Sequence, residues 1–284
     1  MDLRYHNHRF ARELLESPTF APHFAELEAV LGTLPALRRG HPPSLKLAND
    51  KNPIDQDAMN SHLDEQLKAL GWDHHPGGII AGTRLEADYN KARIQVEVQF
   101  GNMARWTYDV FKFQASYATN RIDIGILVVP MRWFAKAIGD NIAYFERIGR
   151  ELPAAKLSIT LPILVVGLDP KDDETLSPHR ERYERESRLD EQWALFLEAW
   201  RIDFPAPIRR AELEELLFHP KYNEPRVMIL KSLLPEDARE GIGESQKTFS
   251  DSFRKALRRR RAKRCIISKG GRDPFLQVIQ DSEV

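Results

Sequence analysis

Two short segments in the middle of the chain are apolar almost throughout. They are IDIGILVVP at residues 122–130 and LSITLPILVVGL at residues 157–168. An almost continuous apolar run is typical of a strand buried on both faces, as parallel strands covered by helices are. Residues 131–151 lie between the two runs and have a helical pattern, as a crossover between parallel strands does. These segments predict an α/β fold in which helices cover both faces of a sheet.

A second strand pattern precedes these runs. Polar and apolar residues alternate along RLEAD, residues 84–88, and along RIQVEVQF, residues 93–100. Alternation with a period of two indicates a strand that presents one face to the core. Because only residues 89–92 join the two segments, we expect a β-hairpin that turns at 89–92.

Helical spacing of apolar residues predicts the remaining elements of this part. Helices are expected at residues 9–38, 54–71 and 102–118, and the eight residues before the first of them are expected to be a flexible terminus. Asn102 is a candidate N-cap of the helix at 102–118. That helix lies between the hairpin and the first apolar run, so we expect it to be a crossover.

The composition excludes several classes of protein. Lys and Arg total 42, as do Asp and Glu, so the chain has no overall basic coat for polyanions. A single cysteine, Cys265, excludes an internal disulfide framework and a multi-cysteine zinc site. No apolar run reaches the roughly 18 residues of a membrane span, and no phosphate-binding glycine motif indicates a nucleotide cofactor. We therefore expect a cytoplasmic protein with no membrane partner.

The character of the sequence changes after residue 170. A strongly charged stretch follows, and residues 252–272 hold ten Lys or Arg and no acid. We expect two domains. The first, at 1–170, is a catalytic core with N-terminal helices, and the second, at 171–284, is a charged linker with a mainly helical, DNA-contacting extension.

The chemistry is concentrated on the predicted hairpin. Glu97 and Gln99 are two residues apart on one strand, so their side chains leave the same face, and Asp88 ends the partner strand. Two neighbouring carboxylates both stay ionised only when a positive charge lies between them. Mg²⁺ prefers such oxygen ligands and can activate a water and stabilise charge on a phosphate. The alternative interpretation, which spacing alone favours, is that Glu97 and Gln99 lie on the solvated face of an amphipathic strand.

The motif Asp88, eight residues, then Glu97-Val98-Gln99 resembles the PD-(D/E)XK nuclease motif in its rarer form with Gln in place of Lys. DYNKARIQVEVQFGN, YDVFKFQ and IDIGILVVPM follow in an order similar to that of BglII/BstYI-like type II restriction endonucleases, and the helix ending in LKALGW resembles theirs. The resemblance covers about residues 54–150. It implies a PD-(D/E)XK restriction-endonuclease-like core with a mixed sheet flanked by helices.

The resemblance also implies the activity. It implies a homodimer around palindromic double-stranded DNA and Mg²⁺-dependent cleavage of both strands. Asp88 and Glu97 would bind the metal, and Gln99 would be the third catalytic residue. A further polar residue is expected upstream of the aspartate, and Asn60, Glu65 and Asp73 all compete for that role.

Basic residues are candidates for phosphate contact. Lys91 and, on the crossover helix, Arg105 and Lys112 lie close to the expected site. The C-terminal run adds a second group, because Arg pairs with phosphate through two hydrogen bonds. Its members are Arg258, Arg259, Arg260, Arg261, Lys263 and Arg264.

The function predicted from these features is a type II restriction endonuclease making Mg²⁺-dependent double-strand cuts at a short palindromic sequence. Two alternatives stay open. One is a repair or mobile-element nuclease of the same fold, and the other is a non-catalytic, sequence-specific DNA-binding protein. Plasmid incubated with the protein and Mg²⁺ would separate the three. A restriction enzyme would give discrete bands, a repair or mobile-element nuclease a smear or nicks, and a non-catalytic protein no change.

Overall fold

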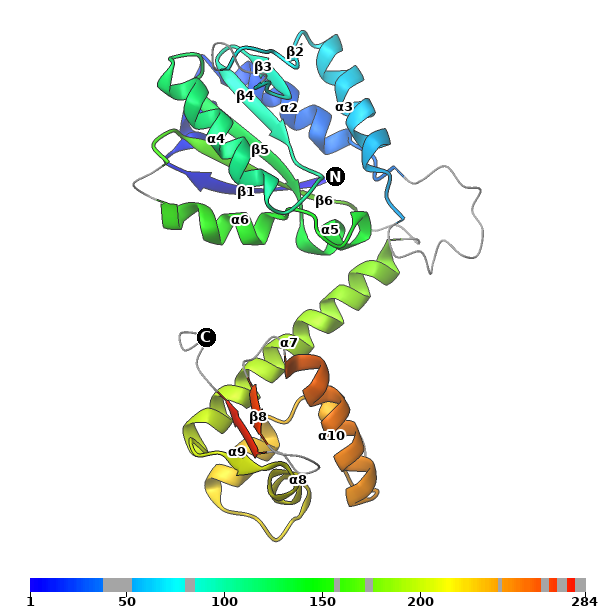
Figure 1. Ribbon diagram of the computed structural model, residues 1–284. Helices are drawn as coiled ribbons and strands as arrows, with labels where there is room; N and C mark the ends of the chain where they lie inside the picture. Colours follow the sequence, from blue (N-terminus) through cyan, green and yellow to red (C-terminus); the bar gives the residue numbers. More distant parts are fainter. Residues whose placement is uncertain are drawn as a thin grey trace. The chain divides into compact units, whose positions relative to one another are not determined.

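The computed structural model describes residues 1–37, 53–79, 85–155, 159–171, 176–239, 242–261, 266–269 and 275–278. The chain divides into two compact units, Met1–Glu181 and Arg182–Val284 (Figure 1). The expected boundary after residue 170 lies eleven residues earlier than this division. Helix α7, Ser177–Asp203, begins in the first unit and ends in the second. Among the described residues, no helix is both long and apolar enough to span a membrane.

The first unit is built on a six-stranded mixed sheet. Its order is β1-β6-β5-β4-β3-β2, with β4, β5 and β6 parallel and the other pairings antiparallel. The strands are β1 (Asp2–His8), β2 (Asp73–His74), β3 (Tyr89–Lys91), β4 (Ile94–Val98), β5 (Ile124–Pro130) and β6 (Ile163–Asp169). Every residue of β5 is buried, which confirms the prediction of a strand covered on both faces.

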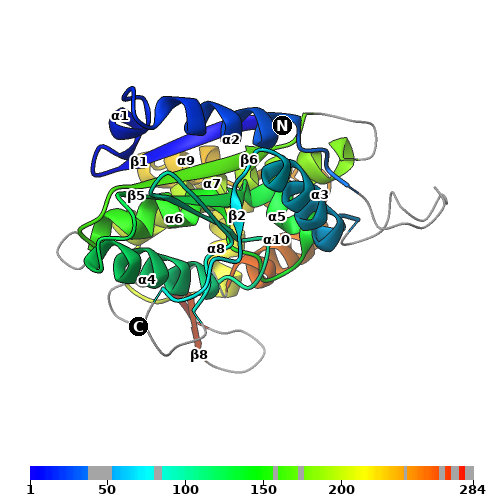
Figure 2. The ribbon, with the colours of Figure 1, turned by 90° about the horizontal axis from the view of Figure 1, so that it is seen from above.

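Helices cover both faces of this sheet. They are α1 (Ala11–Leu15), α2 (Ala21–Thr33), α3 (Gln56–Ala69), α4 (Arg105–Ala118), α5 (Arg132–Ile138) and α6 (Phe145–Glu151), followed by a 3-10 turn at Leu152–Ala155. Trp106 and Phe113 of α4 and Ile148 of α6 share one core with β5 and β6, and α1 and α2 lie across the sheet from α4 (Figure 2). A Cβ on Gly125 would lie 2.8 Å from the Phe113 ring, so glycine lets α4 pack closely on β5. The predicted mixed sheet flanked by helices is confirmed.

The hairpin forms, but the predicted turn is wrong. Residues 89–91 are strand β3, and the chain reverses at Ala92 and Arg93, whose φ angles are +48° and +66°. Two positive φ angles match the right-handed twist of the flanking strands, although Asn-Gly is the usual sequence there. The Arg93 guanidinium binds Asp123 at 2.6 and 2.7 Å and Asn120, which holds an unusual residue in this turn. Residues 85–87 precede the strand and have no regular structure.

The first eight residues are not a flexible terminus. Residues 2–8 form β1, which pairs antiparallel with the whole of β6. The expected helix at 9–38 is two helices, α1 and α2, and its end at residue 38 lies outside the described residues. By contrast α3 matches the expected helix at 54–71, and the Asp55 side chain caps it by accepting hydrogen bonds from two backbone amides.

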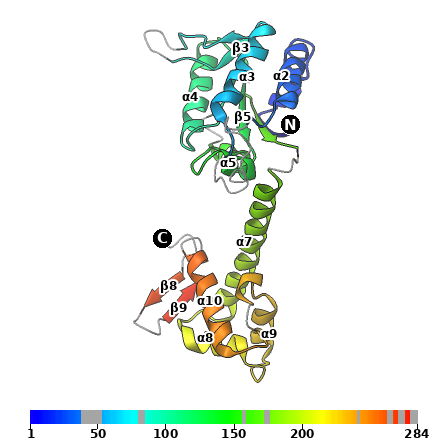
Figure 3. The same ribbon diagram turned by 90° about the vertical axis from the view of Figure 1, so that its right-hand side faces the viewer.

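The second unit is mainly helical and carries a small sheet. Its elements after α7 are β7 (Ile208–Arg209), α8 (Arg210–Phe218), α9 (Pro225–Ser232), a 3-10 turn (Glu236–Ala238), α10 (Gln246–Arg261), β8 (Ile266–Lys269) and β9 (Phe275–Val278), shown in Figure 3. Trp193 and Phe196 of α7 and Phe253 of α10 pack together in its core. The charged stretch after residue 170 therefore contains most of a helix that supplies core residues.

Candidate active site

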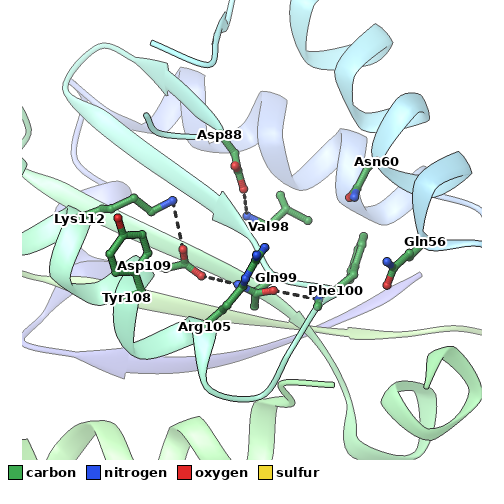
Figure 4. Close-up of a pocket in the computed structure, with 11 residues that line it drawn as sticks. Gln56, Asn60, Asp88, Val98, Gln99, Phe100, Arg105, Tyr108, Asp109 and Lys112 are labelled. Carbon is green, nitrogen blue, oxygen red and sulfur yellow. Dashed lines mark hydrogen bonds and ion pairs between the residues drawn. The ribbon is translucent and has the colours of Figure 1, made fainter. Parts of the chain in front are cut away.

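A cavity of about 420 Å³ opens at the carboxyl end of β4, between α3 and α4 (Figure 4). Parallel strands commonly place functional side chains at this end. Helix α3 contributes two residues, α4 contributes four, and the rest come from β4, the loop after it and the start of the hairpin. The lining residues are Gln56, Asn60, Asp88, Val98, Gln99, Phe100, Gly101, Arg105, Tyr108, Asp109 and Lys112.

Asp88 and Glu97 are neighbours across the hairpin. Tyr89 pairs with Val96, so the next position of the ladder places Asp88 beside Glu97. Oδ2 of Asp88 accepts a hydrogen bond of 2.7 Å from the backbone N–H of Val98. Burial raises the pKa of Asp88, and the bond from Val98 opposes this rise.

Glu97 lies below the cavity lining and is 1% exposed. Its Oε1 accepts a 2.8 Å hydrogen bond from Gln95, and its Oε2 forms an ion pair with Lys112. Burial, together with the charge of Asp88, raises the pKa of Glu97 to about 8, against the opposing effect of Lys112. The solvated-face interpretation is therefore wrong, because α4 covers this face of β4.

The carboxylate cluster, formed by Asp88, Glu97, Asp109 and Lys112, carries more acids than bases. Lys112 Nζ also lies 3.1 Å from Oδ1 of Asp109, so one ammonium serves Glu97 and Asp109 while Asp88 lies beside them. No group of three or more His, Cys, Asp or Glu in the described part of the chain has the arrangement of a metal site. Mg²⁺, however, is commonly held by one or two carboxylates plus waters and phosphate oxygens. Asp88 and Glu97 fit that donor set.

Gln99 is fixed at both ends of its amide. Its Nε2 donates to Oδ2 of Asp109 at 2.7 Å, and its Oε1 accepts from the backbone N–H of Gly101 at 2.9 Å. One N–H and one lone pair are left to face the cavity. Sequence reasoning missed Asp109, although its spacing of three from Lys112 on a predicted helix would have placed both on one face.

Only one of the three upstream candidates reaches the cavity. Asn60 lines it from α3, one turn after Gln56. Glu65 is exposed farther along α3, and Asp73 is exposed on the edge strand β2. The structure thus brings Asn60, and neither of the others, together with Asp88 and Gln99.

The basic candidates near the hairpin occupy different environments. Arg105 lies on the cavity lining, exposed and without an ion-pair partner among the described residues. Lys112 is buried in the carboxylate cluster, not on the surface of α4. Lys91 lies outside the cavity lining, and its ammonium donates to Glu26 and to the carbonyl of Leu70, each at 2.7 Å.

The basic candidates of the C-terminal run are described only in part. Arg258 and Arg259 are exposed near the end of α10. Arg260 and Arg261 complete that helix, but their side chains lie outside the described residues, as do Lys263 and Arg264 entirely.

Comparison with known proteins identifies relatives of the first unit. The family model described as restriction endonuclease BglII/BglIII matches residues 3–168. A crystal structure of restriction endonuclease BglII complexed with a DNA 16-mer is 18% identical, with a TM-score of 0.51 over 61% of this chain and 78% of that one. The structure of free BglII is 17% identical, with a TM-score of 0.44 over 61% and 82% of the two chains. No curated protein sequence matches the chain.

Proposed function

Because the chain belongs to the BglII/BglIII restriction endonuclease family and is a type II restriction endonuclease, we propose that its cavity hydrolyses DNA phosphodiesters with Mg²⁺ as cofactor. The observation that carries this proposal is the pairing of Asp88 with Glu97 beside a cavity lined by polar side chains. The carboxylates of Glu97 and Asp109 contact a single ammonium there, and Asp88 lies beside Glu97. The excess negative charge is what a divalent cation would neutralise.

Asp88 and Glu97 would hold the ion, as ligands of the PD-(D/E)XK type. Bound Mg²⁺ supplies a water of lowered pKa and stabilises charge on the phosphate. For Glu97 to serve as a ligand, its Oε2 has to exchange the contact with Lys112 for the ion. The ammonium would stay near Asp109, which is 3.1 Å away, and would keep the rest of the cluster neutral.

The neighbouring residues would position the substrate and the attacking water. Gln99 is held by Asp109 and Gly101, so its free amide hydrogen points to a defined place in the cavity. We assign Asn60 as the upstream polar residue that contacts the reacting phosphate from the α3 side. Arg105 is exposed at the same cavity and would bind a phosphate through two hydrogen bonds. Lys91 would first have to leave Glu26.

The double-strand cut implies how the chain assembles. A palindromic site presents the same surface twice about a two-fold axis, so a homodimer places one cavity at each strand. We therefore propose a homodimer on double-stranded DNA. We place it in the cytoplasm, where the DNA that restriction enzymes cut is found.

Among the basic candidates near the hairpin, Lys112 is buried within the cluster, so direct phosphate contact from the first unit falls mainly to Arg105.

The test is cleavage of supercoiled plasmid in Mg²⁺ by the wild type and four variants. Asp88→Asn and Glu97→Gln should each slow cleavage at least about a hundredfold, since losing one metal ligand removes several kcal/mol of transition-state stabilisation. Asp73→Asn and Glu65→Gln make the same chemical changes outside the cavity and should cut like the wild type. The proposal predicts discrete bands. A smear would indicate a repair-type nuclease, and wild-type rates in both site variants would refute the assignment.

A further inference from the structure

The second unit has its own order of helices and strands, separate from that of the nuclease core. Strand β7 is followed by helices α8, α9 and α10 and then by the antiparallel pair β8 and β9. The sheet order is β7-β9-β8, so the strand before the helices pairs with the last strand of the unit. A leading helix, a short strand, further helices and a closing hairpin on that strand form the topology of a winged helix-turn-helix domain. The family match ends at residue 168 and leaves this unit out.

We infer that residues 182–284 form a winged-helix module whose helix α10 enters the major groove of DNA as a second recognition element. The inference rests on the proposed function for its ligand, double-stranded DNA. Beyond the proposed function, it identifies α10 as an element outside the nuclease core that contacts bases. In helix-turn-helix proteins the recognition helix lies in the major groove, and its N-terminal half contacts base edges.

One face of α10 is committed to the core of the unit. Phe249, Phe253, Ala256 and Leu257 are buried along it, at spacings of four, three and one residues. Phe253 contacts Trp193 and Phe196 of α7 with ring centroids 6.3 Å apart in each case. This packing fixes which side of α10 can meet a partner.

The opposite face of α10 is polar and basic. Lys247, Asp251, Lys255 and Arg258 follow at four, four and three residues, so they form one stripe, and all four are exposed. Lysine can donate to O6 and N7 of guanine in the major groove, and aspartate can accept from N4 of cytosine. Arg258, in the last turn, suits a phosphate.

Positive charge is concentrated in this part of the sequence. Residues 247–272 hold eleven Lys or Arg and a single acid, Asp251. The unit as a whole is nearly balanced, with 21 basic and 18 acidic residues from 182 to 284. A local concentration of cations in a balanced domain is the electrostatic pattern of a nucleic-acid contact.

A partly buried ion pair links α10 to α8. Glu214 is 2% exposed and accepts hydrogen bonds from Nε and Nη2 of Arg254 at 2.8 and 2.9 Å. Arg210 of α8 approaches the same carboxylate at 3.3 Å. Such bidentate pairs add geometric specificity, so the exposed stripe is presented on a rigid support.

Helix α9 is the weaker candidate for the groove. Its exposed residues include Met228 and Ile229, which are 50% and 51% exposed, and its Arg226 pairs with Glu224 at 3.2 Å. It also does not directly precede the β8–β9 pair, whereas α10 does. Charge and position therefore favour α10.

The experiment uses the full chain and its own cleavage site, mapped from the ends of cut plasmid. A labelled fragment carrying that site is partly methylated at guanine N7, which faces the major groove. Binding without metal then shows which methylated guanines interfere. We expect interference over the nuclease site and over a separate segment, with the second signal lost in Lys247→Ala/Lys255→Ala. Lys221→Ala, which removes an exposed lysine elsewhere in the unit, is the control and should retain both signals.

Affinity measured against salt gives the second readout. Lys247→Ala/Lys255→Ala should weaken binding to the mapped site by at least about tenfold. Arg258→Gln/Arg259→Gln should lower the slope of log affinity against log salt by up to about 1.8, or 0.9 for each lost phosphate contact. Circular dichroism and urea unfolding should show that both double variants fold like the wild type.

Two results would overturn the inference. One is interference and affinity in Lys247→Ala/Lys255→Ala equal to those of Lys221→Ala. The other is an unchanged salt slope in the arginine variant. Neither would touch the nuclease assignment, because cleavage depends on Asp88 and Glu97 in the other unit. Conversely, wild-type cleavage by Asp88→Asn would refute the proposed active site and leave the interference pattern standing.

Discussion

Lys112→Met isolates the electrostatic balance of the carboxylate cluster. The substitution keeps most of the side-chain volume and removes the ammonium that faces Glu97 and Asp109. All three residues are almost fully buried. The change therefore leaves two acids with no compensating cation in direct contact, in surroundings that solvate charge poorly.

The expected cost follows from the geometry. At 3.1 Å and an effective dielectric constant of about 20, the attraction between Lys112 and Asp109 alone is about 5 kcal/mol. Breaking a buried ion pair by removing one partner costs about 3–5 kcal/mol. Burial and the charge of Asp88 already raise the pKa of Glu97, and loss of the opposing effect of Lys112 raises it further, so in the variant this acid can take up a proton and limit the loss. We expect the free energy of unfolding to fall by about 3 kcal/mol, which lowers the Tm of a unit this size by about 6–12 °C.

Magnesium should reverse part of that loss. An ion bound to the native state at a hundred times its Kd adds about 2.7 kcal/mol. At the proposed site the ion would have to displace Lys112 from Glu97 in the wild type, whereas in Lys112→Met no ammonium would compete with it. Thermal unfolding with and without Mg²⁺ should therefore show a larger rise in Tm for the variant than for the wild type.

Lys68→Met is the matched control, because Lys68 is exposed on α3. Its Tm and its response to Mg²⁺ should equal those of the wild type. The reasoning is refuted if Lys112→Met is as stable as Lys68→Met. It is equally refuted if Mg²⁺ raises the Tm of both variants by the same amount.

Substitutions at three further residues test other parts of the first unit. Gln99→Leu removes the bonds to Asp109 and Gly101 and should slow single-turnover cleavage about a hundredfold. Gln99→Glu keeps an acceptor for the Gly101 N–H but places a carboxylate against Oδ2 of Asp109, so it should also slow cleavage, and equal rates for Leu and wild type would make Gln99 a bystander. Asn60→Ala should slow cleavage about tenfold or more without changing the Tm, and an unaltered rate would return the upstream role to another residue. Burial lowers the pKa of His8, so this imidazole binds a proton more readily in the unfolded chain than in the folded one. The free energy of unfolding should therefore fall as the pH drops below about 6.5. His8→Gln should lose less stability than the wild type between pH 7 and 5 in urea titrations, and parallel losses would contradict this.

The elements predicted well were those whose own side chains determine whether the segment is a helix or a strand. A strand buried on both faces requires apolar residues at every position, as in 124–130, and few other structures do. Helix α3 combines an apolar stripe with the capping aspartate Asp55 and Gly71 after its end, at φ +77°. Pattern and end signals agree there, and the boundaries were correct within two residues.

The elements predicted badly depend on distant partners. Strand β1, DLRYHNH, has no apolar alternation because it lies at the edge of the sheet, and its backbone pairing with β6 holds it. The turn of the hairpin lacks glycine, since Arg93 is held at positive φ by Asp123 and Asn120, about thirty residues later. Neither partner is visible from the local sequence. The same holds for Asn60, which only the folding of α3 against the sheet distinguishes from Glu65 and Asp73.

Strand β4 shows why a polar alternation is ambiguous on sequence alone. Gln95, Glu97 and Gln99 have the spacing of a solvated face, yet all three are less than 9% exposed. The face is buried because α4 crosses from β4 to β5, and α4 brings its own polar pair, Asp109 and Lys112, onto it. Burying such a face costs free energy unless every group finds a partner, and here the acids exceed the bases. A site that binds a cation can keep this imbalance, whereas a purely structural core would lose it readily by substitution with apolar residues. The unbalanced charge beneath the cavity is therefore a stronger sign of function than the spacing that first indicated it.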